Sequence, residues 1–258
     1  AGKSMFSTVK AVLFDLDGTL YYGDKAADGA VDTVRAMRER GLRVFFLTNN
    51  STRMREQICR KLNGMDIPCS CDEVFTSGYT AALYAKKERL SNVYIFGSAD
   101  LKREFEQCGV NVADEASAEN LVIGYDPNFS YDGLTAALNV ALKSRMMISC
   151  NSERRFPGNN ARLMPGCGAM VASIEHCSGR KSDYIIGKPN TLMIDMLCEI
   201  YGYSSDELLV VGDTYESDIL MANRKGVQSV LISSAIYDDC VSISRLGELE
   251  NLFMSGKG

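Results

Sequence analysis

The chain has 258 residues, 46% of them hydrophobic and 24% charged, which allows one large domain or two modest ones with buried cores. A net charge of −5 and the lack of a basic stripe argue against nucleic acid or an anionic membrane surface as a partner. No apolar run approaches the roughly 18 residues of a membrane helix, and the N-terminus lacks the apolar stretch of a signal peptide. We therefore expect a cytoplasmic protein.

The first third of the chain alternates short apolar runs with helical patterns, which is typical of parallel α/β structure. Strands are predicted there at 11–14, 43–48 and 72–77, with helices at 28–40 and 52–62. The middle section repeats the pattern, with strands at 92–97, 120–126 and 145–149 and helices at 99–108 and 131–143. The last section has strands at 183–187, 207–212 and 228–233 and helices at 190–201 and 217–224. A loop at 151–168, rich in Arg, Asn, Gly and Pro, indicates a lid or a domain joint.

Nine cysteines and one histidine limit the metal chemistry that the chain can carry. The cysteines are scattered without a C-x-x-C pair, so a Cys/His zinc site is poorly supported and we expect reduced thiols. The histidine, His176, lies in a stretch typical of the last turn of a helix before Gly179. A cation there complements the helix dipole, which favours a structural role.

Polar side chains follow the four most apolar strands, at the point where each strand ends. They are Asp15, the Thr48-Asn49-Asn50 run, Lys188 and Asp213. In an open parallel sheet the ligand crevice lies outside the carboxyl ends of the strands. We therefore expect these side chains to surround one pocket.

The charges of these residues indicate what the pocket holds. Asp15, Asp17, Asp213 and Asp218 would repel one another unless a cation is present or they take up protons. Magnesium suits such a site, because it binds carboxylates, waters and phosphate oxygens. Thr48, Asn49 and the backbone N–H groups that open the helix near Thr52 predict an anion cradle. The pattern therefore favours phosphate together with Mg²⁺.

The segments DLDGT, LTNN, GKP and GDTYESD resemble, in order and context, the four motifs of the haloacid dehalogenase superfamily of phosphohydrolases. The longer stretches TNNST, IIGKPN and VVGDTYESDI resemble the branch that holds para-nitrophenylphosphatase-like, nucleotide, phosphoglycolate and pyridoxal-phosphate phosphatases. The resemblance implies a Rossmann-like parallel-sheet core with a second, inserted α/β cap domain. It implies a discontinuous catalytic core at 5–81 and 182–258 and a cap at 82–181.

The resemblance also implies a role for each matching residue. Asp15 would be the nucleophile that forms an aspartyl-phosphate, and Asp17, protonated when substrate binds, would be the general acid and base. Thr48, Asn49, Asn50 and Lys188 would bind the phosphoryl group. Mg²⁺ would be held by the carboxylate of Asp15, the backbone carbonyl of Asp17 and the carboxylate of Asp213. Asp218 would act through water or behind these ligands.

The cap loop carries the candidates for substrate contact. Where the family often has Thr-Asn-Pro-Asp, this chain keeps Asn151 but has Ser152-Glu153 in place of Pro-Asp. The polar residues of the loop either reach the leaving group of the substrate or form solvated surface. They are Arg154, Arg155, Asn159, Asn160 and Arg162.

Three functions fit these patterns. The first is a magnesium-dependent phosphatase for small phosphate monoesters such as a sugar phosphate, phosphoglycolate, a nucleotide or a cofactor phosphate. The second is a phosphotransferase that uses the same aspartyl-phosphate, and the third is a phosphoaspartate signalling module. The length of the chain and its inserted α/β section favour the phosphatase. The family resemblance also implies a possible homodimer, paired through the caps.

Overall fold

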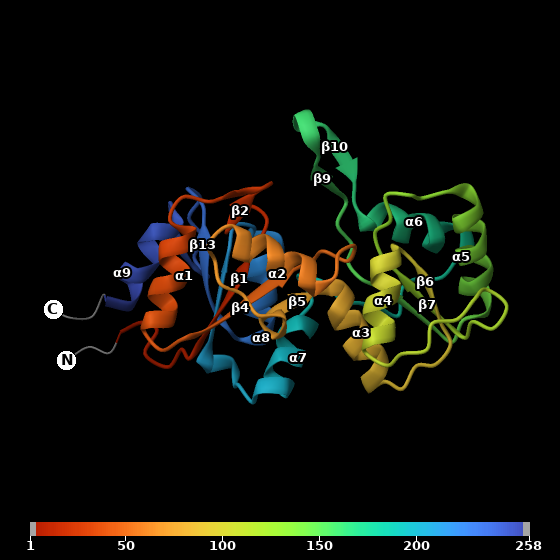
Figure 1. Ribbon diagram of the computed structural model, residues 1–258, viewed down its shortest axis with the longest axis horizontal. Coiled ribbons are helices and arrows are strands. Elements are labelled where there is room, and N and C mark those ends of the chain that lie inside the picture. The colour runs from red at the N-terminus through yellow and green to blue at the C-terminus, as the bar shows by residue number, and fades with distance from the viewer. Residues whose placement is uncertain (1–3, 255–258) are drawn as a thin grey trace. The chain divides into compact units, whose positions relative to one another are not determined.

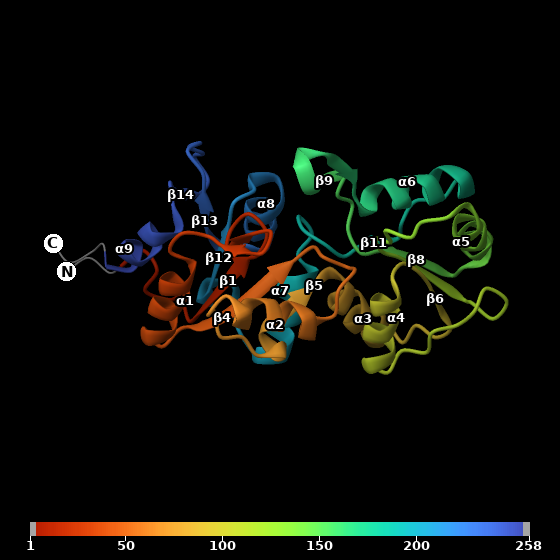
Figure 2. The same cartoon turned by 45° about the horizontal axis from the view of Figure 1, so that its top comes forward.

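Two parallel sheets organise the chain, each with helices on both faces (Figures 1 and 2). The computed structural model describes residues 4–254 and divides into two compact units. The first unit consists of Ala1–Thr48, Arg55–Phe75 and Lys188–Gly258, and the second of Asn49–Met54 and Thr76–Gly187. The fold class is α/β, with a Rossmann-like parallel sheet in the first unit and a second α/β unit inserted into it.

The sheet of the first unit has the strand order β14-β13-β12-β1-β4-β5. Its strands are β1 (Ala11–Asp15), β4 (Arg43–Thr48), β5 (Val74–Thr76), β12 (Leu208–Gly212), β13 (Gln228–Ile232) and β14 (Val241–Ile243). β1 lies at the centre, parallel to β12 on one side and to β4 on the other. Phe14 on β1 is aligned with Phe46 on β4, and both are fully buried, which contributes about 1.5–3 kcal/mol for each ring. The predicted strands at 11–14, 43–48, 207–212 and 228–233 are confirmed.

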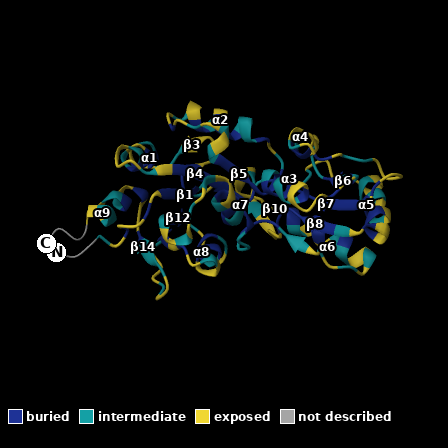
Figure 3. Cartoon of the chain, turned by 90° about the horizontal axis from the view of Figure 1, so that it is seen from below, coloured by how far each residue is buried: buried dark blue, intermediate teal, exposed yellow. Residues whose placement is uncertain are grey.

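Helices cover both faces of this sheet, as Figure 3 shows for α1 and α2 on one side of β1, β4 and β12 and α8 on the other. The helices of the unit are α1 (Ala30–Glu39), α2 (Arg55–Gly64), α7 (Leu192–Tyr201), α8 (Leu220–Lys225) and α9 (Leu249–Met254). One continuous apolar cluster joins Phe14, Phe46 and Val211 of the strands to Met37 of α1 and Leu62 of α2. A short antiparallel hairpin, β2 (Tyr21–Tyr22) and β3 (Lys25–Ala26), follows β1.

The second unit has a smaller sheet with the strand order β11-β8-β7-β6, in which all neighbours are parallel. Its strands are β6 (Val93–Phe96), β7 (Asn120–Ile123), β8 (Met146–Ser149) and β11 (Tyr184–Ile185). Its helices are α3 (Ser77–Lys87), α4 (Ala99–Gln107), α5 (Tyr131–Lys143) and α6 (Cys167–Ser178). α3 and α4 lie on one face of this sheet and α5 and α6 on the other (Figure 2). Leu121 and Ile123 of β7 pack against Val140 of α5 and Ile174 of α6.

The loop at 151–168 contains an antiparallel hairpin, β9 (Arg155–Pro157) and β10 (Leu163–Pro165), that projects from the rest of the second unit (Figure 1). Leu163 is 64% exposed and Met164 38%. The sequence pattern indicated only a polar loop here, because each strand has just three residues and no buried face.

One strand belongs to a different sheet from the one predicted. The sequence predicts that the strand at 183–187 lies in the sheet of the first unit, with Lys188 at its carboxyl end. This prediction is wrong. β11 pairs with β8, through Tyr184 against Ile148 and Ile185 against Ser149, in the sheet of the second unit. Lys188, three residues after β11, is the first residue of the chain's return to the first unit.

One of the two boundaries that the sequence predicted between core and cap falls inside a structural element. The first, between 81 and 82, lies within α3, and the second, between 181 and 182, precedes β11. The segment 255–258 of the predicted core lies outside the described residues. Within 4–254, no helix has both the length and the apolar character needed to cross a membrane.

The nine cysteines are free thiols. His176 lies in the last turn of α6, before Gly179, as the sequence predicted. Gly179 has a left-handed conformation with a φ of 71°.

Candidate active site

The turn after β1 places Asp15 at the edge of the sheet and Asp17 beside it. Asp15 is the last residue of the strand and is partly buried, whereas Asp17 is exposed. The turn closes when the carbonyl of Leu16 accepts hydrogen bonds from the N–H groups of Thr19 (3.0 Å) and Leu20 (2.9 Å). Gly18 has a φ of 83°, and a Cβ atom there would collide with the carboxylate of Asp213. A glycine is therefore required for the turn and for the close approach of the second acidic strand end.

The segment after β12 carries two further carboxylates. Asp213 follows the buried strand directly, and Asp218 lies in a π-helical turn (Tyr215–Ile219) that leads into α8. The N–H of Asp218 donates to the carbonyl of Thr214 (2.9 Å), and its Oδ2 accepts from the N–H of Thr214 (3.3 Å). A Cβ atom at Gly212 would overlap with the Asp218 carboxylate. Such single π-helical turns occur frequently at functional sites.

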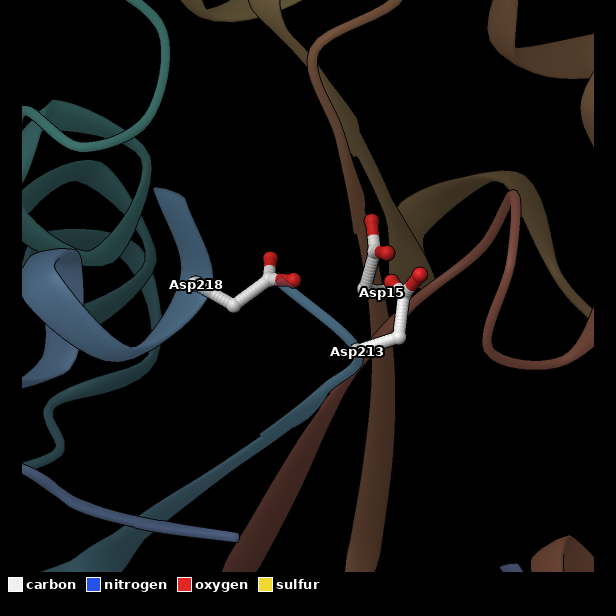
Figure 4. Close-up of side chains that lie close together, drawn as sticks. All are labelled: Asp15, Asp213 and Asp218. Atoms are coloured by element: carbon white, nitrogen blue, oxygen red, sulfur yellow. The ribbon is translucent and has the colours of Figure 1, made fainter. Parts of the chain in front are cut away.

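The three carboxylates of Asp15, Asp213 and Asp218 form one cluster, in which they face a common space (Figure 4). One oxygen from each lies within 4.8 Å of the others. This spacing suits a divalent cation held by oxygen ligands. The prediction that Asp15 and Asp213 lie together is confirmed.

Lys188 connects two members of this cluster. Its Nζ lies 2.7 Å from Oδ1 of Asp15 and 2.8 Å from Oδ1 of Asp218, and it donates to the carbonyl of Leu47 at 2.9 Å. The Lys188 side chain is 3% exposed. A single buried ammonium group therefore faces three carboxylates, and the cluster keeps an excess of negative charge.

The pKa values of the cluster reflect its excess of negative charge. Burial, and then the Asp15 carboxylate, raise the pKa of Asp213 to about 6. Burial and repulsion from Asp15 also raise the pKa of Asp218, and they outweigh the attraction of Lys188. Burial alone would lower the pKa of Lys188, but Asp15 and Asp218 overcome it and raise that pKa well above its ordinary value. Lys188 is charged at neutral pH, while the acids lack a sufficient counter-charge.

Thr19 is a member of the site that the sequence analysis did not single out. Its Oγ1 lies 3.2 Å from Oδ2 of Asp15 and 3.1 Å from Oδ1 of Asp213, and the residue is 2% exposed. Its single proton serves one carboxylate at a time, so Thr19 fixes the spacing of the two acids without neutralising them. The signal for it was its place as the last residue of the DLDGT motif, where a buried hydroxyl follows the glycine turn.

The Thr48-Asn49-Asn50 run is divided between the two units. Thr48, 5% exposed, ends β4, while Asn49 and Asn50 belong to the second unit. The carbonyl of Asn49 accepts from Ser77 Oγ (2.6 Å) and Asn151 Nδ2 (2.7 Å). Its Nδ2 donates to Glu153 Oε1 at 3.1 Å. The backbone of Asn49 is thus fixed by residues that the sequence analysis did not connect with it.

One part of the predicted anion cradle is wrong, namely the free N–H groups near Thr52. The N–H groups of Thr52 and Arg53 donate to Oδ1 of Asn50, at 2.9 and 3.0 Å, and α2 begins only at Arg55. A side-chain carboxamide therefore takes the place that an anion was expected to fill, as in other turns opened by asparagine.

The residues predicted to contact substrate from the cap lie on the β9–β10 hairpin. Arg155 is in β9, Arg154 precedes it, and Asn159 and Arg162 lie in the connection between the strands. All four are exposed.

Comparison with known proteins places these motifs in a family. Residues 12–111 match the family model of haloacid dehalogenase-like hydrolases, and residues 185–243 match a second hydrolase model of the same kind. The glycerol-3-phosphate phosphatase of Homo sapiens is 31% identical over 96% of this chain and 84% of its own length. A sugar phosphatase of Bacillus subtilis is 32% identical over 86% of this chain and 82% of its own.

Solved structures agree with the sequence matches. The crystal structure of a 4-nitrophenylphosphatase from Thermotoga maritima superposes with a TM-score of 0.89 and 28% identity, over 96% of this chain and 98% of that one. The chain therefore belongs to the haloacid dehalogenase-like hydrolases. A family of hydrolases argues against the signalling module among the three functions considered.

Proposed function

We propose that this protein is a magnesium-dependent phosphatase that hydrolyses small phosphate monoesters through an aspartyl-phosphate on Asp15. The observation that carries the proposal is the Asp15–Asp213–Asp218 cluster with Lys188 buried between Asp15 and Asp218. The names of its relatives, which are phosphatases of glycerol 3-phosphate, sugar phosphates and 4-nitrophenyl phosphate, support the same reaction class.

The residues of the cluster fit Mg²⁺. The raised pKa of Asp213 reflects burial and the nearby Asp15 carboxylate, which a bound cation would offset. We assign the metal to the carboxylates of Asp15 and Asp213 and the carbonyl of Asp17. Asp218 already contacts Lys188 and the N–H of Thr214 with its two oxygens, which favours an indirect role. When bound, the metal would supply a positive charge that offsets the charge of the transferring phosphoryl group.

The first half-reaction transfers the phosphoryl group to the protein. A carboxylate oxygen of Asp15 attacks phosphorus, and the bond from phosphorus to the ester oxygen breaks as the new bond forms. Asp17 gives its proton to the departing alkoxide. Its exposed position allows it to meet a substrate oxygen without leaving the turn.

The second half-reaction regenerates Asp15. Asp17, now ionised, removes a proton from water as the water oxygen attacks phosphorus, and the acyl-phosphate bond breaks to release inorganic phosphate. Lys188 holds Asp15 in place and adds positive charge beside the transferring group. Thr48, Asn49 and Asn50 are proposed as further partners of the transferring phosphoryl group, because Thr48 ends β4 and the two asparagines follow it directly.

The substrate is proposed as a small monoester. Relatives named as phosphatases of glycerol 3-phosphate and sugar phosphates and as a 5'-nucleotidase support a sugar or polyol phosphate or a nucleotide. Phosphoglycolate and a cofactor phosphate are the further candidates. Arg154, Arg155, Asn159 and Arg162 are proposed contacts for its leaving group, supported by their exposure on one hairpin. The division into a core at 5–81 and 182–258 and a cap at 82–181, a homodimer and a cytoplasmic location remain predictions.

The test combines a substrate screen with one substitution. We expect the purified protein with Mg²⁺ to release phosphate from several of about a hundred small esters, and a chelator to stop the release until Mg²⁺ is restored. Asp15→Asn should lower kcat at least about 1,000-fold, because it removes the nucleophile. Asp24→Asn, a matched change at an exposed acid, should leave kcat within twofold. Activity of Asp15→Asn within tenfold of wild type would remove Asp15 as the nucleophile.

Two measurements separate the phosphatase from the phosphotransferase. Rapid quenching during turnover should trap a phosphoryl group on Asp15, detected by mass spectrometry. In water labelled with ¹⁸O, the phosphatase should place one labelled oxygen in each phosphate released. Unlabelled phosphate groups that appear on a second hydroxyl compound would favour the transferase.

A further inference from the structure

The loop 233–240, between β13 and β14, contacts the side chain of Tyr215 in the turn that carries Asp213 and Asp218. The Tyr215 ring stacks on Tyr237 with centroids 4.0 Å apart and an interplanar angle of 11°. Its hydroxyl donates a short hydrogen bond to Oδ2 of Asp239. The proposed mechanism assigns no role to these residues.

Asp239 links this turn to the helix that follows it. The same Oδ2 accepts a second hydrogen bond, 2.9 Å long, from Nδ2 of Asn223 on α8. One carboxylate therefore links the first residue of the π-helical turn to α8. Because Asp239 is exposed, it adds little to the apolar core, and its contacts act on the position of Tyr215.

Tyr215 lies between the two acids whose spacing the metal site requires. It is two residues after Asp213 and three before Asp218, and it begins the π-helical turn that carries Asp218. Such turns are rare and frequently lie at functional sites. Because Tyr215 lies between the two acids in the chain, an anchor on its side chain limits the positions that their carboxylates sample. Loss of the anchor should reduce the preorganisation of the cation site.

We propose that Asp239 is a positioning residue for the metal-binding acids, acting through Tyr215. The inference rests on the proposed function, since it assumes that Asp213 binds Mg²⁺. It extends the functional site to the 233–240 loop, which none of the four sequence motifs includes.

The test is the affinity for Mg²⁺ alone, measured by isothermal titration calorimetry without substrate. Asp239→Ala and Tyr215→Phe should each weaken Mg²⁺ binding about threefold to tenfold, the loss that corresponds to one hydrogen bond. The double variant should bind Mg²⁺ no more weakly than Asp239→Ala alone, because that substitution already removes the bond from Tyr215 as well as the one from Asn223. Asp238→Ala, at the exposed neighbouring acid, should bind as the wild type does.

Kinetics provide a second readout that a purely structural role would not move. In Asp239→Ala, saturating Mg²⁺ should restore kcat, with an unchanged KM for the substrate and a higher Mg²⁺ concentration at half activity. Asp239→Asn should recover most of the Mg²⁺ affinity, since its carboxamide oxygen can still accept from Tyr215. If Asp239→Ala fails to fold, Tyr215→Phe, which keeps the stacked ring, decides the question.

The outcomes separate this inference from the proposed function. Equal Mg²⁺ affinities of wild type, Asp239→Ala and Tyr215→Phe would overturn the positioning role while the phosphatase stands. A wild type that binds Mg²⁺ but hydrolyses no ester would overturn the phosphatase, and the calorimetric comparison would still decide the role of Asp239. A wild type that binds no Mg²⁺ would overturn the positioning role, because there would be no metal site to position.

Discussion

The two parallel sheets share an architecture and differ at the carboxyl ends of their strands. In the first unit these ends carry Asp15, Thr48 and Asp213. In the second unit β6 and β7 are followed by Gly97 and Gly124, and both glycines pack against Leu101. A Cβ atom at Gly97 or Gly124 would lie 2.8 or 2.5 Å from Cδ2 of Leu101.

This difference separates scaffold from function. Parallel strands with helices on both faces create an edge where loops meet, but the edge has chemistry only where the chain places polar groups on it. At the ends of β6 and β7 the second unit packs an apolar side chain against glycine backbone. The first unit fills its edge with carboxylates that repel one another, so that this edge is less stable without a cation.

The largest expected effect comes from removing the positively charged ammonium group of Lys188. Lys188→Met should lower the free energy of unfolding by about 3–5 kcal/mol at pH 7.5 without Mg²⁺, because it leaves Asp218 buried without its partner. It should also lower kcat about 100- to 1,000-fold. Urea unfolding and steady-state kinetics measure the two effects. Lys225→Met removes a half-exposed ion pair with Asp195 and should cost less than about 1 kcal/mol; equal losses in the two variants would contradict the special burial of Lys188.

Asp213→Asn tests whether the Asp213 carboxylate, which we expect to bind the metal, destabilises the metal-free protein. We expect Mg²⁺ affinity to fall about 100-fold or more, measured by calorimetry, because one ligand charge is lost. Without metal at pH 7.5 the variant should be more stable than wild type by about 1–2 kcal/mol, since a carboxylate with a raised pKa is replaced by a neutral group of the same shape. A metal-free variant less stable than wild type would show that Asp213 is not strained by its neighbours.

The pH dependence of the metal-free protein follows from the same pKa. In the folded chain the pKa of Asp213 rises from 3.8 to about 6, so between these values the folded state holds more protons than the unfolded state. The stability of the metal-free protein should therefore fall as pH rises from about 4 to about 6.5, by about 1–2 kcal/mol after solvent screening. The raised pKa of Asp218 acts in the same direction.

Saturating Mg²⁺ should remove this loss, because a cation stabilises the ionised acids. Urea unfolding at pH 5 and 7.5, with and without Mg²⁺, measures how the free energy of unfolding changes with pH in each condition. Stability of the metal-free protein that rises through this window would contradict the assignment.

The smallest expected effect is in the second unit. Gly124→Ala should lower its stability by about 1–2 kcal/mol, because the new Cβ atom would force Leu101 out of place. Mg²⁺ affinity should stay within twofold of wild type. Gly64→Ala, at the end of α2 where a Cβ atom meets nothing within 4 Å, is the matched control and should leave stability within about 0.5 kcal/mol. Thermal unfolding checks both variants, and equal behaviour would mean that Leu101 adapts without cost.

Much of the fold was predictable because its signals are local. The helix predicted at 131–143 and the strand predicted at 43–48 have those bounds in the structure. Helical spacing and short apolar runs reside in neighbouring residues, so no distant contact is needed to recognise them. The helix α3 was missed because its Thr76–Lys87 stretch, despite the N-cap that Thr76 supplies to Tyr79, lacks a clear polar face.

The sequence predicted a site residue correctly where that residue stands at the end of a strand in the sheet of the first unit. Asp15 and Asp213 meet this condition, and they lie together. Thr19 was missed because its role depends on a turn that brings its hydroxyl between two acids 198 positions apart, Asp15 and Asp213. The hydrogen bonds from Thr52 and Arg53 to Asn50 were also hidden, since a free helix N-terminus and a capped one differ only in a side-chain rotamer.

The sequence by itself determined most strands of the two parallel sheets and the acids at their ends, because β-propensity, burial pattern and motif spacing are properties of short segments. Only the tertiary structure decided which sheet each strand joins. β11 pairs with β8 although Lys188, just after it, contacts Asp15 and Asp218 of the other unit's sheet. Sheet membership depends on backbone hydrogen bonds between distant segments, and these are set by the whole packing of the chain.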